Sequence, residues 1–284
     1  MASGSSSLQE VLCCLGQPVA GNPTQYVMEK ALAAAGLDWR YLTFEVAPQN
    51  LADAVRGLKA LGFRGANFTI PHKVAAVPLL DRLGKSAQLI GAVNCAVREG
   101  DVWRGENTDG RGFVQSLRPL VDPAGLTVVI LGAGGAARAI AVELALAGAT
   151  RFVIVNRTLA HARAMVELLT EGTRVQAEAV ALDGPYAVPQ EAGLVVNATS
   201  VGMGDPEAHL PLVVETLRPE LVVADVVYHP PQTWLLQTAR QRGCRTLDGL
   251  GMFVNQAALS FELWTGQTPD AAVMRDALEE FLEI

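Results

Sequence analysis

Residues 127–157 read TVVILGAGGAARAIAVELALAGATRFVIVNR, and this stretch decides the fold. Its first five residues are apolar and mostly β-branched, which is typical of a strand that is buried on both faces. The Ala- and Leu-rich run over 137–147 predicts a helix, and Gly148 stands where a helix C-terminal glycine is expected. Residues 151–156 form a second apolar strand. The stretch therefore predicts one β-α-β unit.

Glycines mark the first turn of this unit. Gly132, Gly134 and Ala137 fit the pattern G-x-G-x-x-G/A, with a strand before them and a helix after them. Gly132 permits the sharp bend, and Gly134 lets a pyrophosphate approach the backbone at the positive end of the helix. The alternative is a Gly-rich turn in an α/β protein of another kind. We predict that Gly132, Ala133, Gly134, Gly135 and Ala136 bind the phosphates of a dinucleotide.

The end of the second strand indicates which dinucleotide is bound. Folds that bind NAD usually have an Asp or Glu there, which holds the ribose 2′-hydroxyl. This chain has Asn156, Arg157 and Thr158 instead. Asn156 carries no charge that would repel a 2′-phosphate, and Arg157 offers a planar cation that can bind one. The alternative is that Arg157 is a solvated surface residue. The pattern favours NADP over NAD.

Composition narrows the class of protein. The chain has 284 residues, of which 50% are hydrophobic, and this length suggests about two domains. The net charge of -7 and the lack of a basic stripe argue against nucleic-acid binding. The apolar run over 126–149 is interrupted by glycines and charged residues, so we expect no membrane span. Met1–Ser7 are small and polar, and we expect them to be an unstructured start.

The four cysteines show no zinc spacing, so we predict no metal site. They are most simply reduced core residues of a cytoplasmic protein.

Strands alternate with helices along most of the chain, which predicts α/β layers. Between the β-α-β unit and residue 247, further strands are predicted over 175–182, 194–197, 221–226 and 245–247. Six strands with crossovers give a doubly wound parallel sheet of the Rossmann type. Before this unit, strands are predicted over 11–15, 39–46 and 65–69, followed by a hairpin over 91–104. After it, a helix is predicted over 249–264, and Thr268 and Pro269 are good first residues for a last helix to Leu282.

Two ionisable residues stand in the polar loops of the first part. Lys73 and Asp109 lie in segments rich in Gly, Pro and Asn, where site residues are common. A lysine that is partly buried and tuned by a carboxylate can give or take a proton near neutral pH, as oxidation of a hydroxyl to a ketone requires. The alternative is an exposed salt bridge of little consequence.

These loops resemble the signature motifs of the shikimate dehydrogenase family. The matching stretches are NFTIPHK (67–73), GAVN (91–94), NTDG (107–110), GAGGAARA (132–139), NRT (156–158), NATSVGM (197–203) and residues 249–266. The resemblance covers nearly the whole chain. It implies a smaller α/β substrate-binding domain over 8–110 plus 253–284, an NADP-binding Rossmann domain over 111–252, and an active site in the cleft between them.

The resemblance also implies roles for single residues. Lys73 and Asp109 match the catalytic pair, and Thr69, Asn94 and Gln256 match residues that bind the ring hydroxyls. Tyr228 matches a tyrosine near the substrate, whereas Thr199, Met203 and Gly251 line the nicotinamide side. His161 stands where many members that use NADP have Lys or Arg.

The first loop departs from the family pattern. The family usually has His-Ser-x-Ser-Pro, whose two serine hydroxyls bind the substrate carboxylate. Here the aligned residues are Gly21-Asn22-Pro23-Thr24-Gln25. In an extended segment the side chains of Asn22 and Thr24 would face the same way and could bind the two oxygens of an anion. The alternative is that Asn22 stabilises a turn and Thr24 caps the following helix.

The main hypothesis is an NADP-dependent oxidoreductase that interconverts shikimate, or a close hydroaromatic carboxylate, and its 3-dehydro ketone. This is a step of the shikimate pathway of aromatic amino acid biosynthesis. We expect a cytoplasmic monomer or homodimer with no nucleic-acid or membrane partner. One alternative is a quinate or aminoshikimate dehydrogenase with a different carboxylate substrate. The other is a nucleotide-dependent sensor that retained the fold without turnover.

Overall fold

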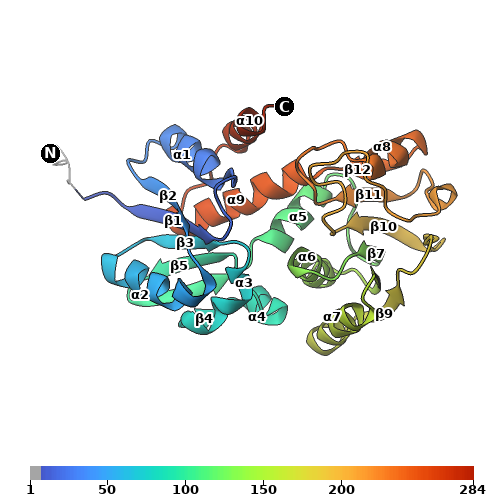
Figure 1. The fold of residues 1–284 in the computed structure, drawn as a ribbon, viewed down its shortest axis with the longest axis horizontal. Helices are drawn as coiled ribbons and strands as arrows, with labels where there is room; N and C mark the ends of the chain where they lie inside the picture. The colour runs from blue at the N-terminus through green and yellow to red at the C-terminus, as the bar shows by residue number, and fades with distance from the viewer. Residues whose placement is uncertain (1–7) are drawn as a thin grey trace. The chain divides into compact units, whose positions relative to one another are not determined.

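The computed structural model describes residues 8–284, so the expectation for Met1–Ser7 lies outside the described residues. These residues divide into two units (Figure 1). Unit 1 comprises the described residues up to Thr108 together with Ala257–Ile284, and unit 2 comprises Asp109–Gln256. Each unit contains one sheet and several helices, as the predicted α/β class requires. Within the described residues, no helix is long and apolar enough to cross a membrane.

Unit 1 is built on a mixed sheet of six strands in the order β2-β1-β3-β5-β6-β4. The strands are β1 (Val11–Gly16), β2 (Arg40–Glu45), β3 (Gly65–Phe68), β4 (Arg82–Leu83), β5 (Cys95–Glu99) and β6 (Val102–Glu106). β1 runs parallel to β2 and β3, whereas β5 is antiparallel to β3 and β6. The helices are α1 (Thr24–Ala34), α2 (Leu51–Leu61), α3 (His72–Ala75), α4 (Lys85–Ile90) and α10 (Ala271–Leu282), with 3-10 turns at Pro48–Asn50 and Val77–Leu79.

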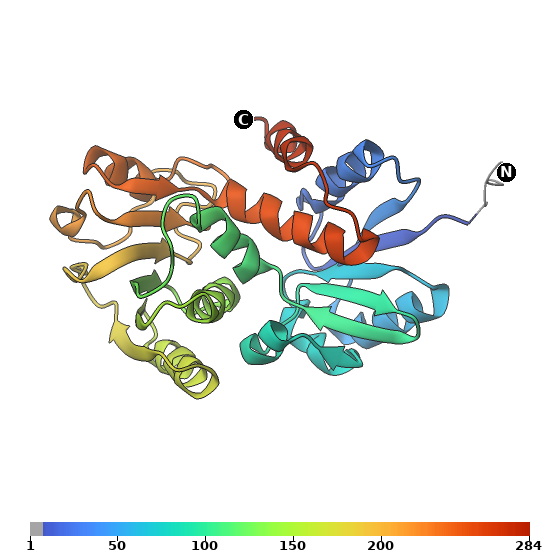
Figure 2. The same cartoon turned by 180° about the vertical axis from the view of Figure 1, so that it is seen from behind.

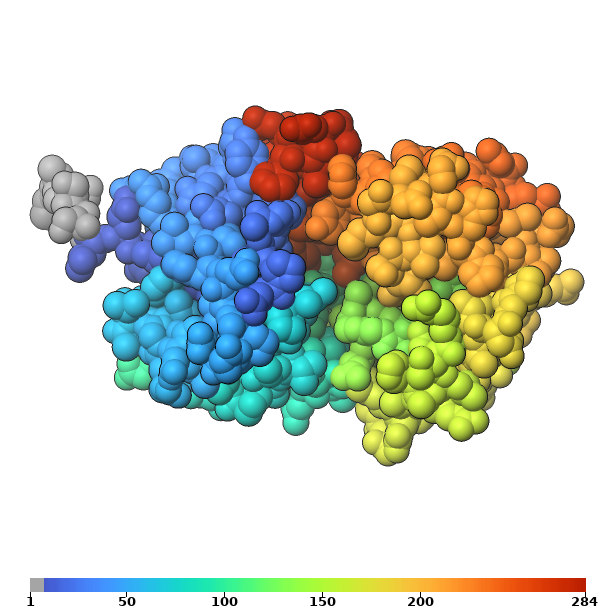
Figure 3. All heavy atoms as spheres, in the orientation of Figure 1, coloured from blue at the N-terminus to red at the C-terminus, as the bar shows by residue number. Residues whose placement is uncertain are grey.

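Apolar residues with strand and helix periodicity form the core of unit 1. On one face of the sheet, Cys13 and Leu15 of β1 pack with Leu51, Val55 and Leu58 of α2. α1 lies on β1 and β2, and α10 packs beside α1, as Figure 2 shows and as the neighbouring blue and red surfaces in Figure 3 show. All four cysteines of the chain are buried and none of them forms a disulfide, which confirms that they are core residues.

Unit 2 contains the predicted doubly wound sheet, in the order β12-β11-β10-β7-β8-β9 with every pair parallel. The strands are β7 (Thr127–Leu131), β8 (Arg151–Asn156), β9 (Gln176–Ala181), β10 (Ala192–Asn197), β11 (Val222–Asp225) and β12 (Arg245–Leu247). The helices are α5 (Asp109–Leu117), α6 (Gly135–Leu146), α7 (Leu159–Gly172) and α8 (Trp234–Gln241), with a 3-10 turn at Val214–Thr216. α9 (Gly249–Thr265) begins in unit 2 and ends in unit 1.

The central strand β7 explains why this sheet folds as the sequence predicted. Residues 128–131 have no exposed surface, so both faces of the strand are covered. Val129 and Leu131 pack on the face that also carries Leu235 and Leu236 of α8. The strand order reverses at β7, because β8 lies on one side of it and β10 on the other. Ligands of such sheets bind beyond the carboxyl ends of the strands at this point.

The last helix begins later than predicted. The sequence suggested Thr268 and Pro269 as its first residues, but α10 begins at Ala271. The Asp270 carboxylate caps it by accepting hydrogen bonds from the backbone N–H groups of Ala272 and Val273, at 2.9 and 3.4 Å. A carboxylate is a better N-cap than a threonine hydroxyl, which explains the shift.

Candidate active site

The turn after β7 presents backbone donors in unit 2. Gly132 has a φ of +107°, and a Cβ atom there would lie 2.9 Å from the Ala198 carbonyl oxygen, so only glycine fits without strain. Gly134 precedes α6 in an extended conformation, and no described side chain caps the helix. A Cβ atom at Gly134 or Gly135 would meet nothing within 4 Å. The first turn of α6 therefore has room for an anion at its N–H groups.

The end of β8 offers a cation beside this turn. Asn156 ends the strand, and its Nδ2 donates to the Thr158 carbonyl oxygen at 2.9 Å. This bond fixes the bend in which Arg157 lies. Arg157 is exposed and forms no ion pair with another described residue. His161 is also exposed, in the first turn of α7. A guanidinium in this position can bind a phosphate through two parallel hydrogen bonds.

A buried carboxylate fixes the loops after β10 and β11. Asp225 is 1% exposed and accepts hydrogen bonds from Asn197 Nδ2, Thr233 Oγ1 and the Val227 backbone N–H, at 2.9, 2.7 and 3.0 Å. Burial raises the pKa of Asp225 to about 6, and these three hydrogen bonds act in the opposite direction. Asn197 in turn accepts from the backbone N–H and the hydroxyl of Thr199, at 3.0 and 2.7 Å. The network therefore sets the position of Thr199.

Three further candidate residues lie on the same side of unit 2. Met203 follows Thr199 in the loop after β10 and is 56% exposed. Tyr228 follows β11, its ring centroid lies 5.4 Å from that of Phe253, and burial raises its pKa. Gly251 lies in the first turn of α9, where a Cβ atom would be 3.1 Å from Ser116 Oγ.

In unit 1, Lys73 lies on the short helix α3, just after β3. Its carbonyl oxygen accepts from the Val93 backbone N–H at 2.8 Å. The Lys73 ammonium also acts on Cys14 in β1, because it opposes the burial that raises the pKa of that thiol to about 12. Thr69 lies between the two strand ends, where its N–H donates to the Leu15 carbonyl oxygen at 3.0 Å. Lys73 and Thr69 are thus together at the carboxyl ends of β1 and β3.

Asn94 and Thr108 hold the backbone that leads to Asp109. Asn94 Nδ2 donates to Thr108 Oγ1 at 2.9 Å, and the Thr108 N–H donates to Asn94 Oδ1 at 2.7 Å. Asp109 follows as the first residue of α5 and is 9% exposed. Gln256 packs against the same helix, because a Cβ atom at Gly112 would lie 2.6 Å from the Gln256 backbone nitrogen.

A second layer of buried polar residues, which the sequence did not reveal, supports Asn94. Asn67 Nδ2 donates to the Asn94 carbonyl oxygen at 2.9 Å, and the Tyr41 hydroxyl donates to Asn67 Oδ1 at 2.6 Å. Ser260 Oγ lies 3.2 Å from Thr108 Oγ1. These residues come from distant parts of the chain, so no local pattern marks them. Two of them did lie in stretches that resemble the family, since Asn67 opens the NFTIPHK motif and Ser260 lies within residues 249–266.

The first loop differs from the extended geometry proposed for it. Asn22 Oδ1 accepts from the Thr24 backbone N–H at 2.9 Å, and Pro23 is in the right-handed helical region. Thr24 is the first residue of α1 and is 7% exposed. The expectation of two side chains facing the same way along an extended segment is therefore wrong. The alternative, in which Asn22 stabilises a turn, is confirmed. An Asn side chain readily accepts a hydrogen bond from the backbone N–H of the residue two positions later. The other part of that alternative is wrong, because Thr24 is itself the first residue of α1 and not its cap.

The described residues contain no group of three or more His, Cys, Asp or Glu side chains that could hold a metal ion.

Comparisons with known proteins place this chain in a family. Family models match the shikimate dehydrogenase substrate binding domain over residues 14–96, shikimate / quinate 5-dehydrogenase over 118–203 and the shikimate 5'-dehydrogenase C-terminal domain over 249–279. The shikimate dehydrogenase (NADP(+)) of Methanopyrus kandleri is 44% identical over 277 residues, which are 96% of each chain. The chain belongs to the shikimate dehydrogenase family. The predicted family, the two-domain α/β fold class and the NADP-dependent oxidoreductase type are thereby confirmed.

Two solved structures extend this relationship. The ligand-free 5-ketofructose reductase of a Gluconobacter strain is 47% identical, with a TM-score of 0.94 and coverage of 97% of this chain and 99% of the other. The shikimate 5-dehydrogenase of Thermus thermophilus, in complex with NADP(H) and shikimate, is 35% identical, with a TM-score of 0.84 and coverage of 96% and 100%. The fold that this chain shares is therefore found in proteins named for two different substrates.

Proposed function

We propose that this protein is an NADP-dependent oxidoreductase that interconverts shikimate and its 3-dehydro ketone. The observation that carries the proposal is the joint presence of Lys73 and Asp109 in a chain 44% identical to a shikimate dehydrogenase (NADP(+)) over 96% of its length. A nucleotide sensor without turnover would not need both residues. In this proposal the reaction takes place in the cytoplasm, in a monomer or homodimer.

Unit 2 has the groups that NADP requires. The N–H groups of Gly134, Gly135 and Ala136 would hold the pyrophosphate, and Arg157, with Asn156 and Thr158, would hold the 2′-phosphate. Thr199, Met203 and Gly251 would contact the nicotinamide end. When bound, NADP supplies the acceptor for the hydride that leaves the carbinol carbon. We assign cofactor binding to unit 2 and most of the substrate contacts to unit 1.

The remaining assignments concern the substrate. Lys73 takes the proton of the reacting hydroxyl during oxidation and returns it to the ketone oxygen during reduction. Asp109 accepts a hydrogen bond that orients the hydroxyl and the lysine. The other ring hydroxyls are bound by Thr69, Asn94 and Gln256, and Tyr228 contacts the ring. Asn22 and Thr24 bind the carboxylate of shikimate.

The test is an assay of the purified protein with shikimate and each nicotinamide cofactor. We expect turnover with NADP, and we expect Lys73→Ala to lower kcat by about 100-fold or more with a modest change in KM, because a general acid–base group contributes about 10²–10⁴. Lys85→Ala removes an exposed ammonium from unit 1 and is the matched control. A wild-type protein that binds NADP but oxidises no hydroaromatic acid would support the sensor instead.

A second candidate substrate is a keto sugar. The 5-ketofructose reductase with a TM-score of 0.94 is at least as similar to this chain, by identity and by fold, as the shikimate dehydrogenase structure described above. Quinate and aminoshikimate are candidates because they carry the same carboxylate as shikimate and differ from it at other positions of the ring. The assay therefore includes 5-ketofructose with NADPH, and quinate and an aminoshikimate with NADP.

A further inference from the structure

We propose that the turn at Asn22–Thr24 lets the substrate site accept an uncharged polyhydroxy ketone, and that this turn decides between neutral and carboxylate substrates. The inference rests on the proposed function, because the reduction uses Lys73 and bound NADPH. A hydride passes from NADPH to the carbonyl carbon, and the Lys73 ammonium gives its proton to the carbonyl oxygen. The products are a secondary alcohol and NADP⁺, and Lys73 regains its proton from water.

The hydrogen bonds of the loop limit what it can offer a ligand. The Asn22 N–H donates to the Val19 carbonyl oxygen at 3.0 Å, and Asn22 Oδ1 accepts from the Thr24 N–H at 2.9 Å. The backbone N–H and the side-chain oxygen of Asn22 are therefore both held by the turn. The groups that remain are the Asn22 Nδ2 and the Thr24 hydroxyl, on a residue that is 7% exposed. A fixed amide and a mostly covered hydroxyl suit one neutral oxygen better than the two oxygens of a carboxylate.

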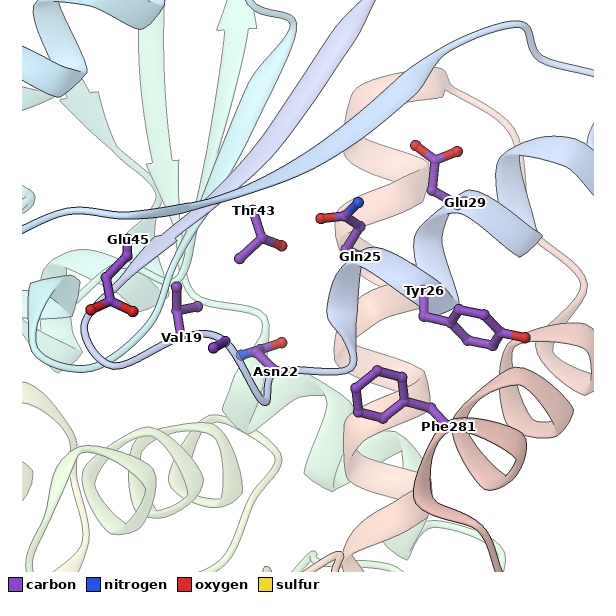
Figure 4. Close-up of a pocket in the computed structure, with 9 residues that line it drawn as sticks. Val19, Asn22, Gln25, Tyr26, Glu29, Thr43, Glu45 and Phe281 are labelled. Atoms are coloured by element: carbon purple, nitrogen blue, oxygen red, sulfur yellow. The ribbon is translucent and has the colours of Figure 1, made fainter.

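The charges around Asn22 favour the same class of ligand. Asn22 lines a pocket of about 500 Å³ within unit 1 (Figure 4). The nine described residues of its wall are Val19, Ala20, Asn22, Gln25, Tyr26, Glu29, Thr43, Glu45 and Phe281. Two of them are acidic and none of these nine is basic. An anion held by Asn22 would lie near like charges, whereas a neutral hydroxyl would not be repelled.

The structure holds one of these acidic side chains in place. Glu29 Oε1 accepts from the Tyr41 backbone N–H at 2.6 Å, so the carboxylate is tied to β2. Figure 4 shows Glu29 on α1 and Glu45 on β2, on either side of Gln25 and Thr43. Lys73, Thr69 and Asn94 do not line this pocket, so its wall bears on the proposal only through Asn22, which belongs both to the wall and to the substrate loop. Beside Asn22, carboxylates and amides would accept hydrogen bonds from the hydroxyl groups of a neutral ligand.

The experiment compares two substrates in three proteins, with 5-ketofructose as the neutral probe and shikimate as the carboxylate. In the wild type we expect kcat/KM for 5-ketofructose to equal or exceed that for shikimate. Asn22→Asp keeps the oxygen that the turn needs and adds a negative charge. We expect it to lower kcat/KM for shikimate by about tenfold or more, the effect of 1.4 kcal/mol, and to change the neutral substrate by less than about threefold. Asn50→Asp adds the same charge at an exposed position of unit 1 outside this wall, and we expect it to change neither value.

A double variant tests the loop in the opposite direction. Asn22→Ser with Thr24→Ser restores the two hydroxyls of the family pattern, and we expect it to shift the ratio of the two kcat/KM values toward shikimate by about tenfold. Melting temperatures show whether each variant is folded.

If the wild type oxidises shikimate but does not reduce 5-ketofructose, the inference is overturned and the proposed function stands. If Asn22→Asp lowers both activities equally, the turn does not select the substrate. If no substrate is turned over, the proposed function itself fails.

Discussion

The two loops to which we assign ligand binding differ in the groups that they present. The loop Gly132–Ala136 in unit 2, which we assign to the cofactor, presents backbone N–H groups, open space at Gly134 and Gly135, and no described side chain that caps α6. The substrate loop, residues 16–24 in unit 1, presents the side chains of Asn22 and Thr24 on a turn that Asn22 itself holds. Backbone recognition requires glycines at fixed spacing, whereas side-chain recognition can change through one or two substitutions. Family members can therefore share a cofactor and differ in substrate.

The largest effect is expected at the cofactor loop. Gly134 has a φ of -85° and a ψ of -170°, which valine adopts readily, and a Cβ atom there meets nothing in the protein. Gly134→Val should therefore leave the melting temperature unchanged. It should weaken NADP and NAD alike by about 100-fold or more, because two lost charge-assisted hydrogen bonds amount to about 3–6 kcal/mol.

Titration calorimetry with both cofactors measures this effect. Gly184→Val is the matched control, since Gly184 is also exposed and without neighbours within 4 Å, but lies outside the loop. Retained affinity in Gly134→Val would mean that the pyrophosphate does not lie on this backbone.

The next effect concerns how the two units fix their loops. Unit 2 uses a buried carboxyl, Asp225, whose pKa burial raises to about 6 from an ordinary value of 3.8. The protonated Asp225 carboxyl stabilises the folded state by about 3 kcal/mol relative to the ionised form. This contribution is fully present below pH 3.8 and is lost as the pH rises through 6. Asp225→Asn does not titrate. We therefore expect the free energy of unfolding of the wild type, minus that of the variant, to fall between pH 4 and pH 7.

Urea denaturation of both proteins across this pH range measures that difference, in which the other titrating groups cancel. In unit 1 the supporting residues Asn94, Thr108 and Asn67 are neutral and do not titrate. Asn67→Asp would introduce a buried carboxyl there, so the free energy of unfolding of the wild type, minus that of this variant, should rise with pH instead of falling. A difference that stays constant with pH would show that Asp225 titrates at its ordinary pKa.

The third prediction asks whether a side chain also decides specificity in unit 2. Arg157→Ala should weaken NADP by about 10- to 150-fold and leave NAD almost unchanged, because one charge-assisted contact contributes about 1.5–3 kcal/mol. Arg163→Ala removes the same charge from the exposed surface of α7 and serves as the control. Equal losses for both cofactors in Arg157→Ala would contradict the assignment to the 2′-phosphate.

The sequence predicted the parts of the molecule that depend on local patterns. The run from Thr127 to Arg157 gave β7, α6 and β8 because apolar periodicity, helix propensity and glycines all agree there. The predicted start of α10 was wrong because Asp270 competes with Thr268 as the N-cap. The sequence alone does not show which of two nearby capping residues is used. The geometry predicted for Asn22 was wrong because its side chain accepts a hydrogen bond from the Thr24 N–H, which favours a turn over an extended segment. The pairing of Tyr41 with Asn67 joins two strands, and no local signal encodes it.

The smallest effect is expected at the substrate loop and concerns stability rather than binding. Asn22→Ala removes the acceptor of the Thr24 N–H at the start of α1, which should cost about 1 kcal/mol, as loss of a capping side chain does. Asn22→Asp keeps the acceptor, and its charge would lie at the N-terminus of a helix that has no acidic residue in its first turn. Glu29 and Glu45 in the wall beside Asn22 oppose this charge, so we expect Asp to match the wild type in stability while Ala falls below it. Neither variant should change the Kd for NADP, which unit 2 binds in our proposal. Urea denaturation and cofactor titration of the three proteins measure both quantities. If Ala and Asp are equally stable, the turn at Asn22 does not depend on its side-chain oxygen, and the contrast between the two loops loses its structural basis.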